Sequence, residues 1–418
     1  MIASENYLHP KDVAAIRDAQ DSGFDQYSEG HTPADGKDLQ SGRYYQQTAQ
    51  VDLLELLAKE RVATVLAKAA PGEAHVNVHA PSGAVANLAA FLGIMELGEK
   101  MVSPDLKDGY GHLSHGANSP SIVGKMFNVR GYVADPQTLR LDYDAIARLV
   151  EEHKPRVLLA GGSSYPRDID WAKIVEIARA HNAITMADIS HPAGPIAAGI
   201  MNDPYAAGVD VIMTTTHKTL RGAKGAVLLW RESLAQRLKS EGRKGMDFAE
   251  FPGLLGGAYN PAIAAHASTF LRAQSREFRE EQERTLRYAK MLAAELKKRG
   301  WNVVTDGTDN HIVLTDITKT AKFGGKHDSW SAAFALESVG IYANKNAVPH
   351  SPGTAVRPAG LRFGTQAVSA LGVGETEMRE LAGMIDETLL LGAKDAKIGK
   401  IRGRVHEMAY AFPAPTYT

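Results

Sequence analysis

Thr214-Thr215-Thr216-His217-Lys218-Thr219-Leu220 is the stretch that decides the fold, because it places a lysine at the end of an apolar run. The run, Val209 to Thr216, is rich in β-branched residues and predicts a strand. A similar run, Ala183 to Asp188, ends on an acid thirty positions before the lysine. Because side chains that follow parallel strands face one crevice, we expect Lys218 and Asp188 to share a site.

Short apolar runs alternate with segments of helical period around this stretch. The further runs are His75 to His79, Arg156 to Ala160 and Ala226 to Trp230, and the helical segments are Asp142 to His153 and Asp170 to His181. Nearly continuous apolar strands suit a parallel sheet covered by helices on both faces. The sequence therefore predicts an α/β fold with a mostly parallel sheet and site residues that follow its strands.

A long charged helix, Arg276 to Arg299, ends at Gly300 and predicts a bridge to a second domain. Beyond it we expect a strand pair, a helix and a final helix, over Trp301 to Asp316, Trp330 to Val339 and Glu375 to Leu391. The expected organisation is an N-terminal segment, residues 1–50, a large domain, residues 51–275, and the bridging helix with a small C-terminal α/β domain, residues 276–418.

The composition excludes several classes of protein. Among 418 residues, 47 Lys and Arg balance 48 Asp and Glu, so no excess charge attracts nucleic acid or a membrane surface. There is no cysteine, which excludes disulfides, thiolate metal sites and a cysteine nucleophile. No apolar stretch is long enough to cross a bilayer, and the N-terminus lacks the pattern of a signal peptide. We expect a cytoplasmic protein without a metal that acts on a small molecule.

A lysine and an acid at neighbouring strand ends are what pyridoxal phosphate requires. The amine forms a Schiff base with this cofactor, and the carboxylate keeps the pyridine nitrogen protonated so that the ring absorbs electrons. A third element, Ala80 to Asn87, is a strand-to-helix turn of small residues whose backbone N–H groups suit a phosphate. Taken alone, its Ser82-Gly83 pair is also an ordinary helix start, and Lys218 is also compatible with a solvated surface lysine.

Further motifs, in their order along the chain, resemble the serine hydroxymethyltransferase family of fold-type I (aspartate aminotransferase-like) pyridoxal-phosphate enzymes nearly end to end. Besides the Asp188 and Lys218 segments, the motifs are Ile2 to Asn6, Tyr27 to Gly30, Gly42 to Tyr45, Gly111 to Gly116, Phe251 to Gly253, Gly256-Gly257, Gly307 to His311, Asn344 to Asn346 and Gly360 to Thr365. The resemblance implies a homodimer with shared active sites, to which residues 1–50 contribute, or a tetramer built from such dimers.

The resemblance also implies roles for individual residues. Lys218 would carry the cofactor, Asp188 would pair with the pyridinium, and His112 would stack on the ring. The other expected cofactor contacts within the subunit are Ser82 and Gly83 at the phosphate, Asn87 and His191 near the ring hydroxyl, and also Ser164 and His217. Gly256-Gly257 would come from the neighbouring subunit. The expected substrate contacts are Arg362 and Ser4 at the carboxylate, Tyr27 and the catalytic Tyr45 from the partner subunit, and Glu29 as acid or base.

The chain departs from the family's pattern around the phosphate and second-substrate sites. The departures are Gln46-Gln47 in place of a glycine pair, Pro81 to Ala84, Asp108 to Gly111, Ser190, Ala223 to Ala226, Gly253 to Gly257, and longer segments at His31 to Gly42 and Pro352 to Ala359. Because the cofactor residues are kept while these surroundings change, we expect an L-threonine transaldolase. Such an enzyme cleaves threonine to acetaldehyde and adds the glycine unit, held as a quinonoid, to another aldehyde without folate.

Three alternatives stay open. One is a tetrahydrofolate-dependent serine hydroxymethyltransferase that interconverts serine and glycine, and another is a simple threonine or α-methylserine aldolase. The third is a non-catalytic relative, which would be free to lose Lys218, Asp188 or Arg362, whereas this chain keeps all three. The sequence does not identify the acceptor aldehyde or the stereochemistry of the product.

Overall fold

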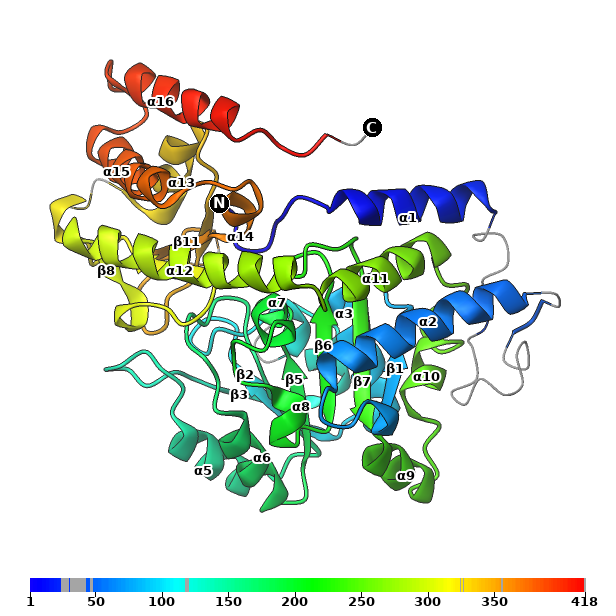
Figure 1. Ribbon diagram of the computed structural model, residues 1–418. Helices are drawn as coiled ribbons and strands as arrows, with labels where there is room; N and C mark the ends of the chain where they lie inside the picture. Colours follow the sequence, from blue (N-terminus) through cyan, green and yellow to red (C-terminus); the bar gives the residue numbers. More distant parts are fainter. Residues whose placement is uncertain are drawn as a thin grey trace.

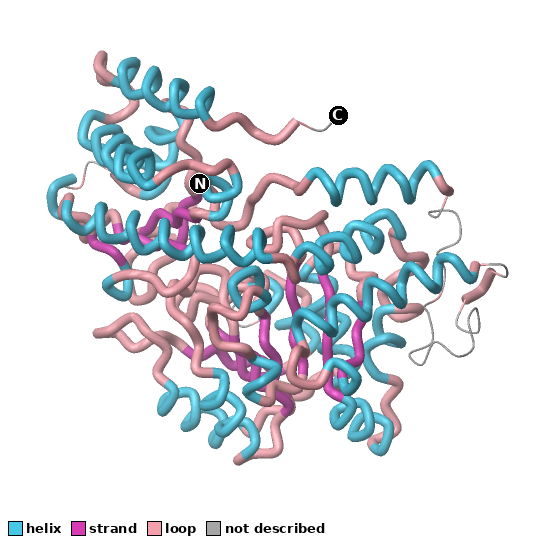
Figure 2. Tube along the Cα trace, in the orientation of Figure 1, coloured by secondary structure: helices cyan, strands magenta, loops and turns pink. Residues whose placement is uncertain are grey.

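The structure, a computed structural model, describes residues 1–23, 30, 43–45, 48–116, 120–323, 325, 327–354 and 356–416. Its centre is a sheet with helices on both faces, and the long helix α12 (Arg276–Lys298) leads from it to a smaller C-terminal region (Figure 1). Figure 2 shows the strands in two groups, one in the large region and one beside the C-terminal half of α12. The site residues come from both groups.

The large sheet has seven strands in the order β1-β7-β6-β5-β4-β2-β3. Their bounds are β1 (Ala74–Asn77), β2 (Lys100–Pro104), β3 (Asn128–Tyr132), β4 (Val157–Ala160), β5 (Ile184–Asp188), β6 (Val211–Thr215) and β7 (Ala226–Arg231). The neighbours from β6 to β3 run parallel, whereas β7 runs antiparallel to β6 and β1. β7 reverses because the loop Thr216 to Gly225 is too short for a helical crossover. The predicted mostly parallel sheet is confirmed, with β7 reversed.

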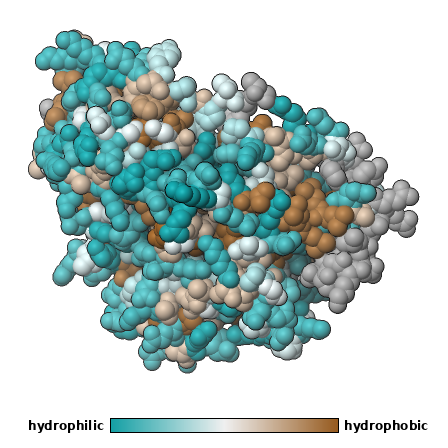
Figure 3. Space-filling model, in the orientation of Figure 1, coloured by the Kyte–Doolittle hydropathy of each residue, from teal (hydrophilic) through white to brown (hydrophobic). Residues whose placement is uncertain are grey.

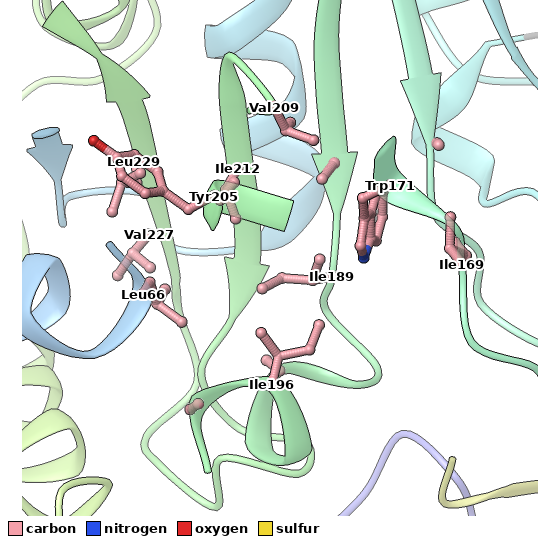
Figure 4. Packing of buried hydrophobic residues seen from close by; sticks show 14 of the residues in the cluster. Leu66, Ile169, Trp171, Ile189, Ile196, Tyr205, Val209, Ile212, Val227 and Leu229 are labelled. Atoms are coloured by element: carbon pink, nitrogen blue, oxygen red, sulfur yellow. The ribbon is translucent and has the colours of Figure 1, made fainter. Parts of the chain in front are cut away.

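Apolar cores cover both faces of this sheet. One core includes α2 (Ala49–Leu66), α5 (Tyr143–His153), α6 (Trp171–Arg179), α7 (Ala193–Ala197), α8 (Pro204–Ala207) and α11 (Asn260–Arg272). The other includes α3 (Gly83–Ile94), α4 (Val123–Met126), α9 (Glu232–Ser240) and α10 (Gly245–Glu250). Successive side chains of β6 point to opposite faces of the sheet, so Ile212 packs in the first core and Met213 in the second. Figure 4 shows Leu66 of α2 and Ile196 of α7 packed against the strands.

The C-terminal region has a core of its own. Its sheet has the order β10-β11-β9-β8, and its neighbours all pair antiparallel. The bounds are β8 (Asn302–Val303), β9 (Ile312–Asp316), β10 (Asn344–Asn346), β11 (Gly360–Gly364), α13 (Ser329–Glu337), α14 (Gln366–Ala370), α15 (Glu375–Leu391) and α16 (Ile398–Ala411). The apolar faces of α12, α13 and α15 fill the space against this sheet. The small α/β region is thus confirmed, while the boundaries at residues 50 and 275 stay predictions.

The sequence-based assignment of the last helix is wrong. α15 has the expected bounds, but α16 follows it. The apolar pattern of α16 is weak because Ile398 and Ile401 are its buried residues, and Gly399 and Gly403 lower its helix propensity. Within the part of the chain that the structure describes, no helix combines the length and the hydrophobicity of a transmembrane span.

The first residues of the chain connect the small region to the large one. The Gly364 N–H donates to the carbonyl of Met1 at 2.8 Å, and Gln366 Nε2 donates to the carbonyl of Glu5 at 2.6 Å. Asn6 Nδ2 then donates to the carbonyl of Lys218 at 3.1 Å. The segment between these contacts therefore lies at the junction of the two regions, and α1 (Pro10–Asp21) continues along α11 (Figure 1).

Candidate active site

A cavity of about 370 Å³ opens at the carboxyl ends of β5 and β6. Its walls come from the start of α3, from these strand ends, from β10 and β11, and from the N-terminal segment. The lining residues are Ser4, Ser82, Gly83, Ala84, Asn87, His112, Gly162, Ser163, Asp188, Ser190, His191, Met213, Thr215, His217, Lys218, Asn346 and Arg362. The fold thus brings together residues from both ends of the chain.

Asp188 is the last residue of β5 and accepts three hydrogen bonds. Its Oδ2 contacts Asn87 Nδ2 and His115 Nε2, each at 3.1 Å, and its Oδ1 accepts from the Ser190 N–H at 3.1 Å. The His112 N–H donates to Nδ1 of His115 at 3.1 Å, so the proton of His115 lies on Nε2 and points at the acid. Burial alone would raise the pKa of Asp188, but the His115 hydrogen bond and nearby positive charge hold it below the ordinary value. Asp188 is therefore ionised at neutral pH.

Lys218 follows β6 in a loop that several hydrogen bonds hold in place. Its own carbonyl accepts from Asn6, while Thr219 Oγ1 donates to the His191 carbonyl at 2.7 Å and accepts from the Gly194 N–H at 2.8 Å. Burial, together with the charge of Arg362, lowers the pKa of Lys218 to about 8, although Asp188 opposes this shift. An amine with this pKa is partly neutral near pH 7, which is the form that reacts with a carbonyl.

The start of α3 is built to receive an anion. Ser82 is the N-cap residue, and its Oγ accepts from the Val85 N–H at 3.4 Å. The amides of Gly83 and Ala84 have no hydrogen-bond partner in the part of the chain that the structure describes, and the positive end of the helix dipole lies here. A Cβ at Gly83 would come within 2.8 Å of Thr215 Cγ2. The close approach of the helix start to β6 therefore requires glycine.

Four histidines around the cavity are held neutral. Burial lowers the pKa of His112 and of His217 to about 4 and that of His311 to about 3, and it lowers the pKa of His191 well below the ordinary value. The rings of His191 and His311 stack, with centroids 5.4 Å apart and an interplanar angle of 14°. Neutral rings offer flat surfaces and single hydrogen bonds without placing further positive charge beside Lys218.

Arg362 of β11 is a buried cation with no carboxylate partner among the described residues. Its Nε donates to Asn344 Oδ1 at 3.0 Å, and its Nη1 donates to the carbonyl of Ser163. Burial lowers its pKa to about 10, which leaves the guanidinium charged at neutral pH. Because a buried charge without a counterion is costly, this arrangement favours an anionic ligand such as an amino acid carboxylate.

The structure brings ten of the predicted site residues into one cavity. These are Ser4, Ser82, Gly83, Asn87, His112, Asp188, His191, His217, Lys218 and Arg362. Ser164 is buried beside this cavity and lines a second one instead. Gly256 and Gly257 are exposed away from the cavity, and Tyr45 is 45% exposed, whereas Tyr27 and Glu29 lie outside the described residues.

Sequence reasoning missed several residues of the site. His115 donates a hydrogen bond to Asp188 directly. Ser114 accepts a hydrogen bond from the Asn87 amide, which also donates to Asp188. The ring of His311 stacks on that of His191. The motif Gly111 to Gly116 contained the signal for His115, because two histidines three positions apart fall on one side of a helical turn.

A second cavity of about 380 Å³ adjoins the first and shares Ser163 and Asn346 with it. Its lining comes from the segments after β2 and after β4, from β10 and from the segment between β10 and β11. The residues are Leu106, Lys107, Gly111, Leu113, Ser163, Ser164, Lys345, Asn346, Ala347, Val348, Ser351, Pro352, Gly353, Thr354, Pro358 and Ala359. Two adjoining cavities of this size suit a reaction between two small molecules.

A buried ionic cluster around Glu55 of α2 lies outside the lining of both cavities. Glu55 of α2 contacts Arg43 Nη2 at 2.5 Å, Lys59 Nζ at 2.6 Å and His79 Nε2 at 3.0 Å. Nearby Glu250 has no hydrogen bond to either carboxylate oxygen within the described residues, and burial raises its pKa to about 7. Glu250 therefore titrates near neutral pH.

The first cavity fits pyridoxal phosphate on the chemistry of its side chains. Lys218 offers an amine, Asp188 a permanent carboxylate, and the start of α3 an anion site. Two buried polar atoms, Asn87 Oδ1 and His217 Nδ1, have no hydrogen-bond partner in the described part of the chain. Buried polar atoms without partners are rare in proteins and indicate a polar ligand here.

A lysine after β6, an acid at the end of β5 and a helix start beside them define the class of fold-type I pyridoxal-phosphate enzymes. A sequence profile described as serine hydroxymethyltransferase matches residues 1–385. The serine hydroxymethyltransferase of Myxococcus xanthus (strain DK1622) is 37% identical over 413 residues, which cover 99% of this chain and 91% of that protein. The chain belongs to the serine hydroxymethyltransferase family. The expected family, fold class and enzymatic nature are thus confirmed, and the family implies pyridoxal phosphate.

Proposed function

We propose that this enzyme is an L-threonine transaldolase, which moves the glycine unit of threonine to a second aldehyde without folate. One observation supports the proposal. Among the segments that depart from the family's pattern, Pro352 to Ala359 contributes five described residues to the walls of the second cavity, and Asp108 to Gly111 contributes Gly111. In the first cavity, Lys218, Asp188 and Arg362 keep the residue types that the family resemblance requires. A reaction centre that keeps these three residues beside a second cavity with an altered wall suits a changed acceptor.

Three residues of the first cavity would each act on one group of the substrate or of the cofactor. Arg362 would hold the carboxylate of threonine with its guanidinium, and Asp188 would keep a proton on the pyridine nitrogen. Lys218 would hold the cofactor through its side-chain amine, which its lowered pKa leaves partly neutral near pH 7. When bound, pyridoxal phosphate supplies the electron sink for the pair released at Cα.

The overall reaction balances without an oxidant or a reductant. The Cα–Cβ bond of threonine breaks, its hydroxyl loses a proton, and acetaldehyde leaves. A new Cα–Cβ bond forms to the carbonyl carbon of the second aldehyde, whose oxygen takes up a proton. Glu29, the proposed acid or base at the hydroxyl, lies outside the described residues.

We also propose that the enzyme is a homodimer whose partner subunits complete each site. Tyr44 and Tyr45 are 73% and 45% exposed, and Gly256-Gly257 is exposed as well. Apolar side chains gather on the surface over α2 and α11, where Leu53, Leu57 and Leu271 are exposed (Figure 3). Exposed apolar surface of this kind supports a subunit interface.

The second candidate is a tetrahydrofolate-dependent serine hydroxymethyltransferase. The name of the 37% identical protein from Myxococcus xanthus favours it. In that case the second cavity would hold the folate, and serine rather than threonine would be the productive donor.

The two candidates differ in their second substrate, which decides the experiment. The purified enzyme, loaded with pyridoxal phosphate, is incubated with threonine and a panel of aliphatic and aromatic aldehydes without folate. Its matched control is serine with tetrahydrofolate. New β-hydroxy amino acids in the first reaction support the transaldolase. Folate-dependent cleavage of serine, with no such product from threonine, would replace it by the hydroxymethyltransferase.

A further inference from the structure

Two loops, one from each region of the fold, lie against each other. The β4 loop, residues 161–168, follows the central strand β4, and the β9 loop, residues 304–311, leads into strand β9 of the small sheet. The Asp309 N–H donates to the carbonyl of Pro166 at 2.8 Å. Asn310 Nδ2 donates to the carbonyl of Tyr165 at 2.9 Å. Hydrogen bonds therefore join the two loops along their length.

The side chain of Arg167 makes the largest number of contacts across this junction. Its Nη1 donates to Asp309 Oδ1 at 3.0 Å, its Nε donates to Thr305 Oγ1 at 3.1 Å, and its Nη2 donates to the carbonyl of Thr305 at 2.5 Å. The side chain is 14% exposed, so water competes little for these contacts. Every nitrogen of the guanidinium thus bonds to the β9 loop, an arrangement that suits the planar fork of arginine.

These contacts support a turn that the backbone alone disfavours. Thr305, Asp306 and Gly307 have φ angles of 58°, 62° and 144°. A positive φ is costly for a β-branched residue such as threonine. Arg167 binds both the hydroxyl and the carbonyl of Thr305, and a Cβ at Gly307 would lie 3.2 Å from its Nη2. Arg167 therefore holds the β9 loop in its turned conformation.

The end of the β9 loop carries parts of the first cavity. His311 Nε2 lies 3.1 Å from the carbonyl of Ala3, which precedes the cavity residue Ser4. Strand β9 begins at the next residue and pairs with β11, where Leu314 is opposite Arg362. The position of the β9 loop thus sets the positions of two residues that we expect at the substrate carboxylate.

Arg362 crosses the same junction in the opposite direction. Its Nη1 donates to the carbonyl of Ser163 in the β4 loop, whereas Arg167 of the β4 loop donates to the β9 loop. The separation of the two loops therefore decides where the guanidinium of Arg362 is held. Two parallel hydrogen bonds to a carboxylate require a precise placement of that guanidinium, and small displacements are costly.

We propose that Arg167 is a positioning residue for the substrate carboxylate, because it fixes the loop separation at which Arg362 and Ser4 face that group. Arg167 lies outside the lining of both cavities described above, so it acts through these residues. The inference rests on the proposed binding of an amino acid carboxylate by Arg362. That binding is common to the transaldolase and the hydroxymethyltransferase, so the choice between them does not affect it.

Glycine and glycinamide test this role on the loaded enzyme, because they differ only in the carboxylate. The change in the absorption spectrum of the bound pyridoxal phosphate gives the Kd of each ligand. Arg167→Met should raise the Kd of glycine about tenfold and leave that of glycinamide within about twofold. A general loss of structure would weaken both ligands equally, so the ratio of the two Kd values separates positioning from stability.

Further variants make the test independent of any single protein. Arg167→Lys keeps one charged donor, and Asp309→Asn removes the ion pair but leaves the contacts to Thr305, so each should raise the Kd of glycine about threefold. Arg148→Met replaces an exposed arginine on α5 and is the matched control, which should leave both Kd values unchanged. A ratio in Arg167→Met equal to that of the parent enzyme overturns the inference, whichever reaction the enzyme catalyses. Equal binding of the two ligands by the parent enzyme removes the carboxylate role of Arg362 and overturns the inference with it.

Hydrogen exchange of the cofactor-free protein provides a readout without any ligand. The Asp309 N–H donates to the β4 loop, and the Thr365 N–H donates to the carbonyl of His311 at 3.3 Å. In Arg167→Met, both amides should exchange about tenfold faster, while the amides of α15 keep the rates of the parent protein. Unchanged exchange at Asp309 and Thr365, or an equal rise throughout the protein, overturns the positioning role.

Discussion

The amine of Lys218 should be much more reactive than an ordinary lysine amine when the protein is free of cofactor. Burial lowers its pKa to about 8 from the ordinary 10.5. At pH 7, an amine with a pKa of 8 is neutral about one-tenth of the time, and an amine with a pKa of 10.5 about once in three thousand. The neutral fraction of Lys218 is therefore about 300 times that of an ordinary lysine. This difference prepares the side chain to form a Schiff base.

Trace labelling with an amine-reactive anhydride between pH 6 and pH 10 measures this property directly. Peptide mass spectrometry follows the labelling rate of Lys218 beside that of the exposed Lys239 in the same sample. We expect the rate at Lys218 to rise through a midpoint near pH 8 and then to level off. The charge of Asp188 raises the pKa of Lys218, so Asp188→Asn should move the midpoint to lower pH. A midpoint near pH 10 would show that burial does not lower the pKa of Lys218, and an upward shift in the variant would show that Asp188 does not raise it.

Three further predictions follow from the buried groups. The folded state raises the pKa of Glu250 from 4.5 to about 7, so its contribution to stability is present below pH 4.5 and is lost as the pH rises through 7. Glu250→Gln should remove about 3 kcal/mol from the pH dependence of the free energy of unfolding. Urea unfolding of both proteins at pH 5 and pH 8 measures this difference. An equal change in the free energy of unfolding for both proteins would contradict the prediction. Arg362→Lys should lower kcat/KM for threonine about 10- to 100-fold, because lysine cannot form the bidentate hydrogen bonds that arginine makes to a carboxylate. Unchanged steady-state kinetics would exclude Arg362 as the carboxylate-binding residue. His115→Phe removes a hydrogen bond to Asp188 and should weaken cofactor binding about tenfold in a fluorescence titration, whereas equal affinity would show that His115 does not support the acid.

The strands that carry the site could be predicted from the sequence because their chemistry is local. Apolar runs that end in Asp188 and before Lys218 mark β5 and β6, and the parallel arrangement then places both ends at one edge. The ordered motifs added Arg362 and Ser4, which lie far from that edge in the sequence. Periodicity alone does not reveal that β11 and the N-terminus meet there, since contacts over such separations depend on the whole fold.

Other features depend on contacts that no local pattern encodes. His115 owes its role to a hydrogen bond across 73 positions, and Glu250 owes its raised pKa to burial. The reversed strand β7 follows from a short loop after Lys218, and α16 was missed because little of it is buried. The second cavity joins the turn after β2 to a loop of the small region, so its walls become visible only in three dimensions.

In the proposed reaction the glycine unit of threonine passes to another aldehyde, and carbon labelling follows this transfer. The loaded enzyme receives threonine labelled with carbon-13 at Cα, 4-carboxybenzaldehyde and no folate, and nuclear magnetic resonance follows the label while acetaldehyde is assayed separately. We expect the label to appear in a new β-hydroxy amino acid in equal amount to the acetaldehyde released, and we expect Lys218→Ala to abolish both. Acetaldehyde without labelled product, label found only in glycine, or label transfer that requires tetrahydrofolate would contradict this expectation.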